Sequence, residues 1–168
     1  METQILNEFK IQSIFRLKEG YRMVVKALDF IDEKELWQIP VENGMSLGNQ
    51  ILHSCGNMRQ YIISSLGNQI DSRKRDLEFK TKSQLEKKVL LKQLKETIDA
   101  SIQIINKTNE QEYLKVKKVQ AFSFSGIGLV LHAVEHFSYH VGQIAFWVKF
   151  LTQKDLGFYN GIDLAKNN

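Results

Sequence analysis

The stretch that decides the fold is residues 125–153, which read SGIGLVLHAVEHFSYHVGQIAFWVKFLTQ. Apolar residues recur there at steps of three and four, the spacing that gathers side chains on one face of an α-helix. One stripe holds Val130, Val134, Phe137, Val141, Ile144, Val148 and Leu151, and a second holds Leu129, Trp147 and Phe150. A helix that is apolar on most sides is packed on most sides, so the sequence predicts a long interior helix from about Ser125 to Gln153.

Three further segments outside this stretch also carry a helical apolar period. The first covers about Glu2 to Phe30. The second follows an N-cap at Ser46 and ends near Gly67, and the third is opened by a capping box at Ser83–Glu86. Between them lies a polar connection, residues 68–82, long enough to cross the length of a bundle. We therefore expect an all-α fold, a four-helix bundle with a long crossover between its second and third helices.

The composition is that of one ordinary domain spanning residues 1–168, with 43% hydrophobic and 25% charged residues. One proline and ten glycines are few for an all-β protein, and the weak alternation in residues 112–124 favours a short extended piece or a loop. Cys55 is the single cysteine, which excludes an intrachain disulfide. A chain of this length buries a full hydrophobic core without a structural metal, so a bound metal would serve function rather than folding.

The N-terminus, METQILNEFK, carries charges where a secretory signal would be apolar. The longest nearly uncharged stretch, residues 119–135, is too short and too polar to cross a bilayer, so we expect a cytoplasmic protein without a membrane partner. The net charge is +4, and the densest basic clusters are Arg73–Arg75 and Lys115–Lys118. Such clusters are usually solvated, and the sequence disfavours a nucleic-acid partner without excluding one.

Histidine spacing supplies the strongest functional signal. His132, His136 and His140 are four residues apart on the long helix, and side chains at that spacing share one face with Cβ atoms about 5–6 Å apart. Two imidazoles on neighbouring turns can reach one metal ion at about 2.0–2.1 Å, but a third turn lies too far along the helix. We expect His132 to support the site by a hydrogen bond, and a ligand from another helix to complete it. The remaining histidine is His53.

Two short segments carry a family resemblance. The segments His132-Ala-Val-Glu-His-Phe-Ser-Tyr-His-Val-Gly-Gln143 and Gln50-Ile-Leu-His-Ser-Cys-Gly-Asn57 resemble the DinB-like (DinB/YfiT) superfamily of metalloenzymes. That superfamily pairs a lone His on its second helix with H-x3-H-x-G-Q on its fourth. The tail Asp155-Leu-Gly-Phe-Tyr159 is similar to that of a branch of unknown function.

The resemblance implies a four-helix bundle of up-down-down-up topology that is frequently a homodimer. It also implies a divalent metal ion bound by His53, His136 and His140. Val141 stands where an arginine is common before the Gly-Gln pair, so any substrate contact made by that arginine is absent.

Several neighbours of these histidines are further candidates. Periodicity alone places His53 about 150° from the apolar stripe of its helix, a position that faces water or a polar pocket. The side chains expected to line such a pocket beside His132 are Asn57, Gln143 and Trp147. Glu135 and Tyr139 are candidate acids, bases or hydrogen-bond donors, although a solvated Glu and a packed Tyr are the simpler expectation. Cys55 falls on the apolar stripe and is expected in the core.

Three neutral imidazoles leave a coordination position open, as catalytic zinc sites do, and imidazole suits both Zn and Ni. Such an ion can activate water for hydrolysis or hold a low-molecular-weight thiol as thiolate for transfer. The resemblance includes thiol-dependent S-transferases, so we expect a metal-dependent transferase or hydrolase acting on a small molecule. The alternatives are a non-catalytic dimeric bundle, a binding module related to stress response, and a nucleic-acid binder that uses the clusters at Arg73 and Lys115.

Overall fold

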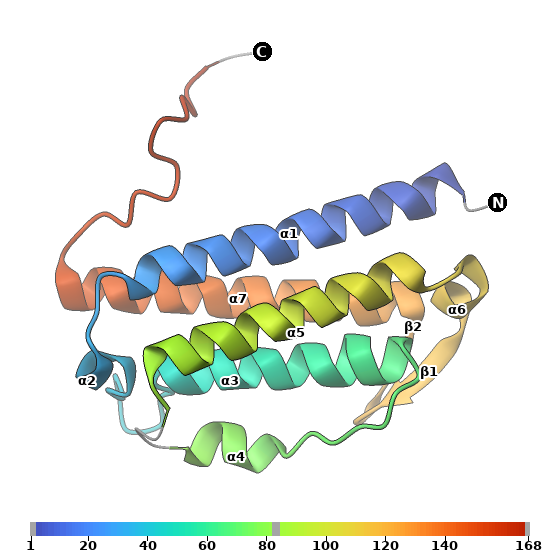
Figure 1. Ribbon diagram of the computed structural model, residues 1–168, viewed down its shortest axis with the longest axis horizontal. Coiled ribbons are helices and arrows are strands. Elements are labelled where there is room, and N and C mark those ends of the chain that lie inside the picture. Colours follow the sequence, from blue (N-terminus) through green and yellow to red (C-terminus); the bar gives the residue numbers. More distant parts are fainter. Residues whose placement is uncertain (1–2, 82–84, 167–168) are drawn as a thin grey trace.

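The computed structural model describes residues 3–81 and 85–166, and this part of the chain is mostly helical (Figure 1). The long helical segments are α1 (Gln4–Leu28), α3 (Leu47–Met58) continued by the π-helix η1 (Arg59–Leu66), α5 (Lys87–Lys107) and α7 (Gly126–Thr152). The short elements are α2 (Glu33–Leu36), α4 (Arg75–Lys80), α6 (Glu110–Leu114), β1 (Val116–Val119) and β2 (Phe122–Ser125). None of the described helices combines the length and the apolarity needed to cross a bilayer.

The long helices lie side by side, α1 and α7 running one way and α3 and α5 the other (Figure 1). α1 packs on α7 and α5, and α3 packs on the same two helices. α1 approaches α7 closely at Gly20, where an added Cβ would lie 2.7 Å from the Phe137 ring. The apolar stripes read from the sequence meet in one core, to which Leu17, Leu94 and Val148 contribute fully buried side chains.

The prediction for residues 125–153 is confirmed almost to the residue. The Ser125 hydroxyl accepts a hydrogen bond from Gly128 N and opens α7. The helix ends at Thr152, where Gln153 adopts a left-handed conformation with φ 55°. Ser46 opens α3 in the same way by accepting from Asn49 N. These caps are local, which is why the sequence reveals them.

The other helix boundaries need corrections. α1 ends at Leu28, two residues before the predicted Phe30, and the predicted start at Glu2 lies outside the described residues. α5 begins at Lys87, and Ser83 of the predicted capping box also lies outside the described residues. The carboxylate of Glu33, on α2, accepts the hydrogen bond from Lys87 N at 3.0 Å. A residue more than fifty positions away therefore caps this helix.

Two features depart from a fold built of regular α-helices alone. β1 and β2 form an antiparallel hairpin, with Val116 opposite Ser125, so the fold is mostly helical rather than all-α, and the extended alternative for residues 112–124 is confirmed. The second predicted helix ends near Gly67 as expected, but its last eight residues wind as a π-helix, with Gly67 N donating to Ile62 O at 2.9 Å. π-turns of this kind often occur at functional sites.

Candidate metal centre

Three histidines from two helices meet between α3 and α7. His53 lies on α3, and His136 and His140 lie one turn apart on α7. One ring nitrogen from each residue lies within 4.8 Å of the others, and His53 Nε2 is 3.1 Å from His136 Nε2. Two nitrogens bound to one ion at about 2.0–2.1 Å are themselves about 2.9–3.4 Å apart for tetrahedral or octahedral angles. The His53–His136 pair lies within this range, and a small rotation of the third ring would bring its nitrogen to the same ion, so these three histidines could hold a metal ion.

Their surroundings keep the imidazoles of His136 and His140 neutral. Burial, together with repulsion from the neighbouring His140 and His53, lowers the pKa of His136 to about 3. Burial, with repulsion from His53, lowers the pKa of His140 to about 4. The neutral imidazole is the form that binds metals, so no proton has to leave either ring before a metal binds near neutral pH.

Hydrogen-bond partners indicate which nitrogen is free in the rings of His53 and His140. His53 Nδ1 is 2.8 Å from a carboxylate oxygen of Glu78, an acceptor, so Nδ1 carries the proton and Nε2 carries the lone pair. His140 Nδ1 is 3.3 Å from the Gln50 side-chain oxygen, which leaves its Nε2 free in the same way. His136 Nδ1 is buried without a hydrogen-bond partner in the described part of the chain. The donor set fits a divalent cation, because His53 Nε2 and His136 Nε2 lie 3.1 Å apart, a separation at which two imidazole nitrogens can bind one ion.

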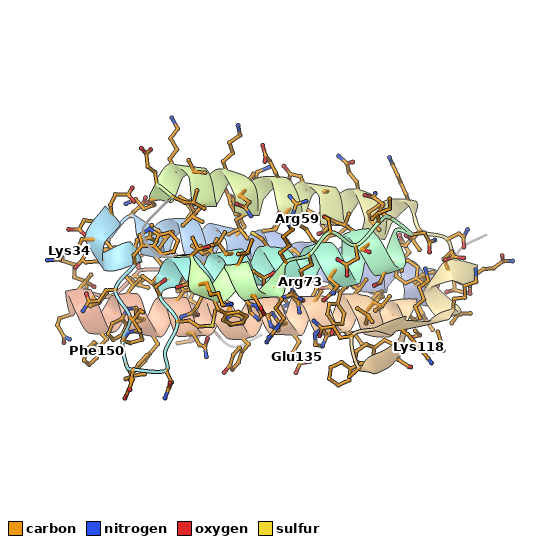
Figure 2. All side chains as sticks on the ribbon, turned by 90° about the horizontal axis from the view of Figure 1, so that it is seen from below. Lys34, Arg59, Arg73, Lys118, Glu135 and Phe150 are labelled. Atoms are coloured by element: carbon orange, nitrogen blue, oxygen red, sulfur yellow. The ribbon has the colours of Figure 1, made fainter. Side chains whose placement is uncertain are left out.

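The crossover segment supplies two residues that the sequence analysis did not connect with this site. Arg73 donates from Nε and Nη2 to the two carboxylate oxygens of Glu78, each at 2.8 Å. Burial raises the pKa of Glu78, but hydrogen bonds from Arg73 and His53 outweigh it and hold the pKa below its ordinary value. Figure 2 views the molecule from the side of α4 and shows Arg73 against α3. Glu78 is thus a buried carboxylate beside a candidate ligand.

These contacts decide one open expectation and correct another. His53 does not face water: it is 8% exposed, because Glu78 and the ring of Phe79 cover it. Arg73 is not a solvated member of a basic cluster, since only 3% of its side chain is exposed. The available signal was Leu77-Glu78-Phe79, an apolar pair around an acid within the polar connection.

The ring of His132 lies next to the cluster formed by His53, His136 and His140 but is not part of it. Its ring stacks on Tyr61 at a centroid distance of 4.1 Å, and its Nε2 is 3.3 Å from the amide nitrogen of Asn57. Asn57 is buried, and its side-chain oxygen has no partner among the residues that the structure describes. Both residues therefore form one wall next to His136, whose ring lies 5.9 Å from that of His132.

A cavity of about 600 Å³ adjoins His140 on the opposite side. Gln50 and Gln143 line it, and both also contact His140, Gln143 through a hydrogen bond that raises the pKa of that ring against the effect of burial. Apolar walls come from α7 and the loop before α3, namely Phe146, Trp147, Phe150, Pro40, Val41 and Met45. None of the described lining residues carries a charge.

Neither candidate acid or base is enclosed. Tyr139 is 63% exposed, so the packed tyrosine expected from the sequence is wrong, because no described element covers that side of α7. Its ring nevertheless meets the ring of His140 edge-on at a centroid distance of 5.2 Å. Glu135 is exposed and lies on the outer face of α7 (Figure 2). Val141, which takes the place of the common arginine, is buried near Gly20 of α1.

Cys55 is expected to be chemically inert in the native protein. It is 1% exposed, as predicted for a core residue, and burial raises the pKa of its thiol to about 12. Because the thiolate is the reactive form, a chromogenic disulfide reagent at pH 8 should modify the native thiol more than about a hundredfold more slowly than the unfolded one. Equal rates before and after denaturation would contradict this burial.

Comparisons with known proteins agree with this architecture. Residues 4–167 match the model of a family described as protein of unknown function DUF1572. The structure is similar to a DinB-like protein, YjoA, from Bacillus subtilis, with 16% identity and a TM-score of 0.67 over 88% of this chain and 96% of that one. It is also similar to a DinB-like protein from Bacillus cereus, with 13% identity and a TM-score of 0.66 over 85% and 90% of the two chains.

No curated protein sequence matches the chain. Identities of 13–16% show a shared fold, and on that level the resemblance read from the histidine segments is confirmed. The chain belongs to the DUF1572 family and has the fold of DinB-like proteins.

Proposed function

We propose that this protein is a divalent-metal-dependent enzyme in which His53, His136 and His140 bind Zn or Ni and leave one coordination position open for an exogenous ligand. The observation that carries the proposal is the convergence of three ring nitrogens within 4.8 Å. A bound ion of this kind lowers the pKa of a bound water or thiol. That chemistry suits hydrolysis or thiol-dependent transfer on a small molecule.

The residues around the histidines support a small-molecule substrate. Gln50 and Gln143 orient His140 and also line the uncharged cavity of about 600 Å³, which can take an apolar part of a substrate next to the open position. Trp147 forms an aromatic wall of that cavity. Tyr139 is the nearer of the two proton-transfer candidates, since its ring contacts His140 whereas Glu135 lies exposed on the outer face.

We further propose that residues 1–168 form one domain and that its long helices make an up-down-down-up bundle. The opposed directions of α1 and α7 against α3 and α5 support this topology.

The proposal is tested with protein purified without a histidine tag. Elemental analysis should find about one metal ion per chain, and the loaded protein should turn over a member of a panel that pairs low-molecular-weight thiols with electrophiles or offers esters and amides. The variant His53→Ala should lose both metal and turnover. Wild-type protein that takes up no Zn or Ni, or turnover equal to that of His53→Ala, would remove the proposal.

A specific observation supports the alternative of a non-catalytic dimer. α7 exposes large apolar side chains, with Leu131 54%, Phe146 69% and Phe150 58% exposed. Phe146 and Phe150 lie one turn apart, and contiguous exposed apolar groups mark interaction surfaces. A dimer that binds metal but gives no turnover above His53→Ala would favour this function.

The nucleic-acid hypothesis has less support. The Arg73 guanidinium is engaged by Glu78, and Lys117 Nζ donates to Ser65 O and to Glu112, each at 2.9 Å. These two cations are therefore used inside the chain and are not presented to a phosphate backbone.

A further inference from the structure

A carboxylate is the buried side chain of an otherwise exposed helix. α4 is a short helix of the crossover that lies across α3, and Glu78 is the buried residue within it, 8% exposed. The neighbours Leu77 and Phe79, which would bury favourably, are 55% and 37% exposed. Burying a carboxylate in place of an apolar group is costly unless its oxygens are satisfied. The hydrogen-bond partners of the Glu78 carboxylate therefore indicate why it is buried.

Those partners are one cation and one candidate metal ligand. Arg73 meets both oxygens of Glu78 in a bidentate pair at 2.8 Å, the strongest common geometry for such a pair. The ion pair is complete without a third group. One of its oxygens nevertheless also accepts from His53 Nδ1 at 2.8 Å, on the side of the ring opposite the nitrogen that faces His136.

α3 is shaped to receive this carboxylate. A Cβ added at Gly56 would lie 1.8 Å from Glu78 Oε1, so no other residue at that position leaves room for it. One turn before His53, the buried amide of Asn49 donates to Glu78 O at 2.9 Å and to Thr81 O at 2.8 Å. The α3 positions on both sides of the candidate ligand therefore fix α4 against it.

We propose that Glu78, held by Arg73, is a positioning residue of the metal centre, so that the crossover segment determines how tightly His53 binds the ion. This inference rests on the proposed function. The carboxylate keeps the proton of His53 on Nδ1 and directs Nε2 towards His136. Its oxygen lies 2.8 Å from His53 Nδ1, closer than Arg73 Nη2 at 3.3 Å, and hydrogen-bond partners of this kind tune the affinity of metal ligands.

The test is the affinity of tag-free protein for Zn²⁺, measured by competition with a chromophoric chelator. Glu78→Gln, which keeps the volume and removes the charge, should bind Zn²⁺ about 10- to 100-fold more weakly than wild type. Gly56→Ala should weaken binding similarly, although it alters no polar group, because its methyl displaces the carboxylate. Asp76→Asn is the matched control: it lies on the same helix with its side chain 82% exposed, and its affinity should equal that of wild type.

A second readout separates positioning from general destabilisation. In metal-free protein, the Nδ1 proton of His53 should give a slowly exchanging, downfield NMR signal that disappears in Glu78→Gln, while thermal unfolding confirms that the variant is folded. A folded Glu78→Gln variant with wild-type affinity would overturn the inference and leave the proposed function standing. Wild-type protein that binds no Zn²⁺ would overturn both.

Discussion

Replacing His136 by alanine is expected to abolish stoichiometric metal binding. A zinc ion held by four ligands is bound by about 10–16 kcal/mol, so one ligand accounts for roughly 2.5–4 kcal/mol, or about 70- to 850-fold in affinity. His136 Nε2 lies 3.1 Å from His53 Nε2, which makes it central to the cluster of three. Elemental analysis and chelator competition of tag-free protein should therefore show about one ion in wild type and almost none in His136→Ala.

The matched control is His132→Ala, one turn away on the same helix. His132 stacks on Tyr61 and is not one of the three convergent histidines, so its loss should change metal content far less than the loss of His136. Equal metal loss in both variants would show that the ligands are not the ones assigned to this centre.

Metal-free protein should lose stability as the pH falls from 7 to 5. The pKa values of His136 and His140 are lowered in the folded state to about 3 and 4, while an unfolded histidine titrates near 6.5. The unfolded chain therefore binds more protons than the folded chain throughout this window, so the free energy of unfolding decreases as the pH falls. Each imidazole contributes at most about 1.4 kcal/mol per pH unit, and since water screens the partly exposed His136 we expect about 2 kcal/mol for the pair.

Urea unfolding at pH 7 and pH 5, in the presence of a chelator, measures this loss. The double variant His136→Gln, His140→Gln should show a much smaller difference between the two pH values. The window lies above the range in which carboxylates titrate, so Glu78 contributes little to it. Unfolding of wild type that is independent of pH in this window would contradict neutral, buried imidazoles.

Features of the chain that depend on local interactions could be predicted from the sequence. The helix from Gly126 to Thr152 follows from its apolar period and from the hydroxyl of Ser125, both of which act within a few residues. The juxtaposition of His136 and His140 follows from helix geometry alone. The family resemblance assigns His53 to the same site, and in the structure its ring lies beside those of His136 and His140.

Features that depend on distant segments could not be predicted in this way. His53 is buried because α4 folds back over it, and no pattern within α3 shows this. The start of α5 is capped by Glu33, and Arg73 is removed from solvent by Glu78. In each case a charged side chain in a polar stretch finds its partner only in the folded chain, where the cost of burying it is offset by that partner.

Anomalous diffraction from crystals of the metal-loaded, tag-free protein tests the central claim most directly. Data collected at the absorption edge of the metal found by elemental analysis should show one strong peak about 2.0–2.2 Å from a ring nitrogen of each of His53, His136 and His140. A peak bound elsewhere, or one that lacks the His53 ring among its ligands, would contradict the account.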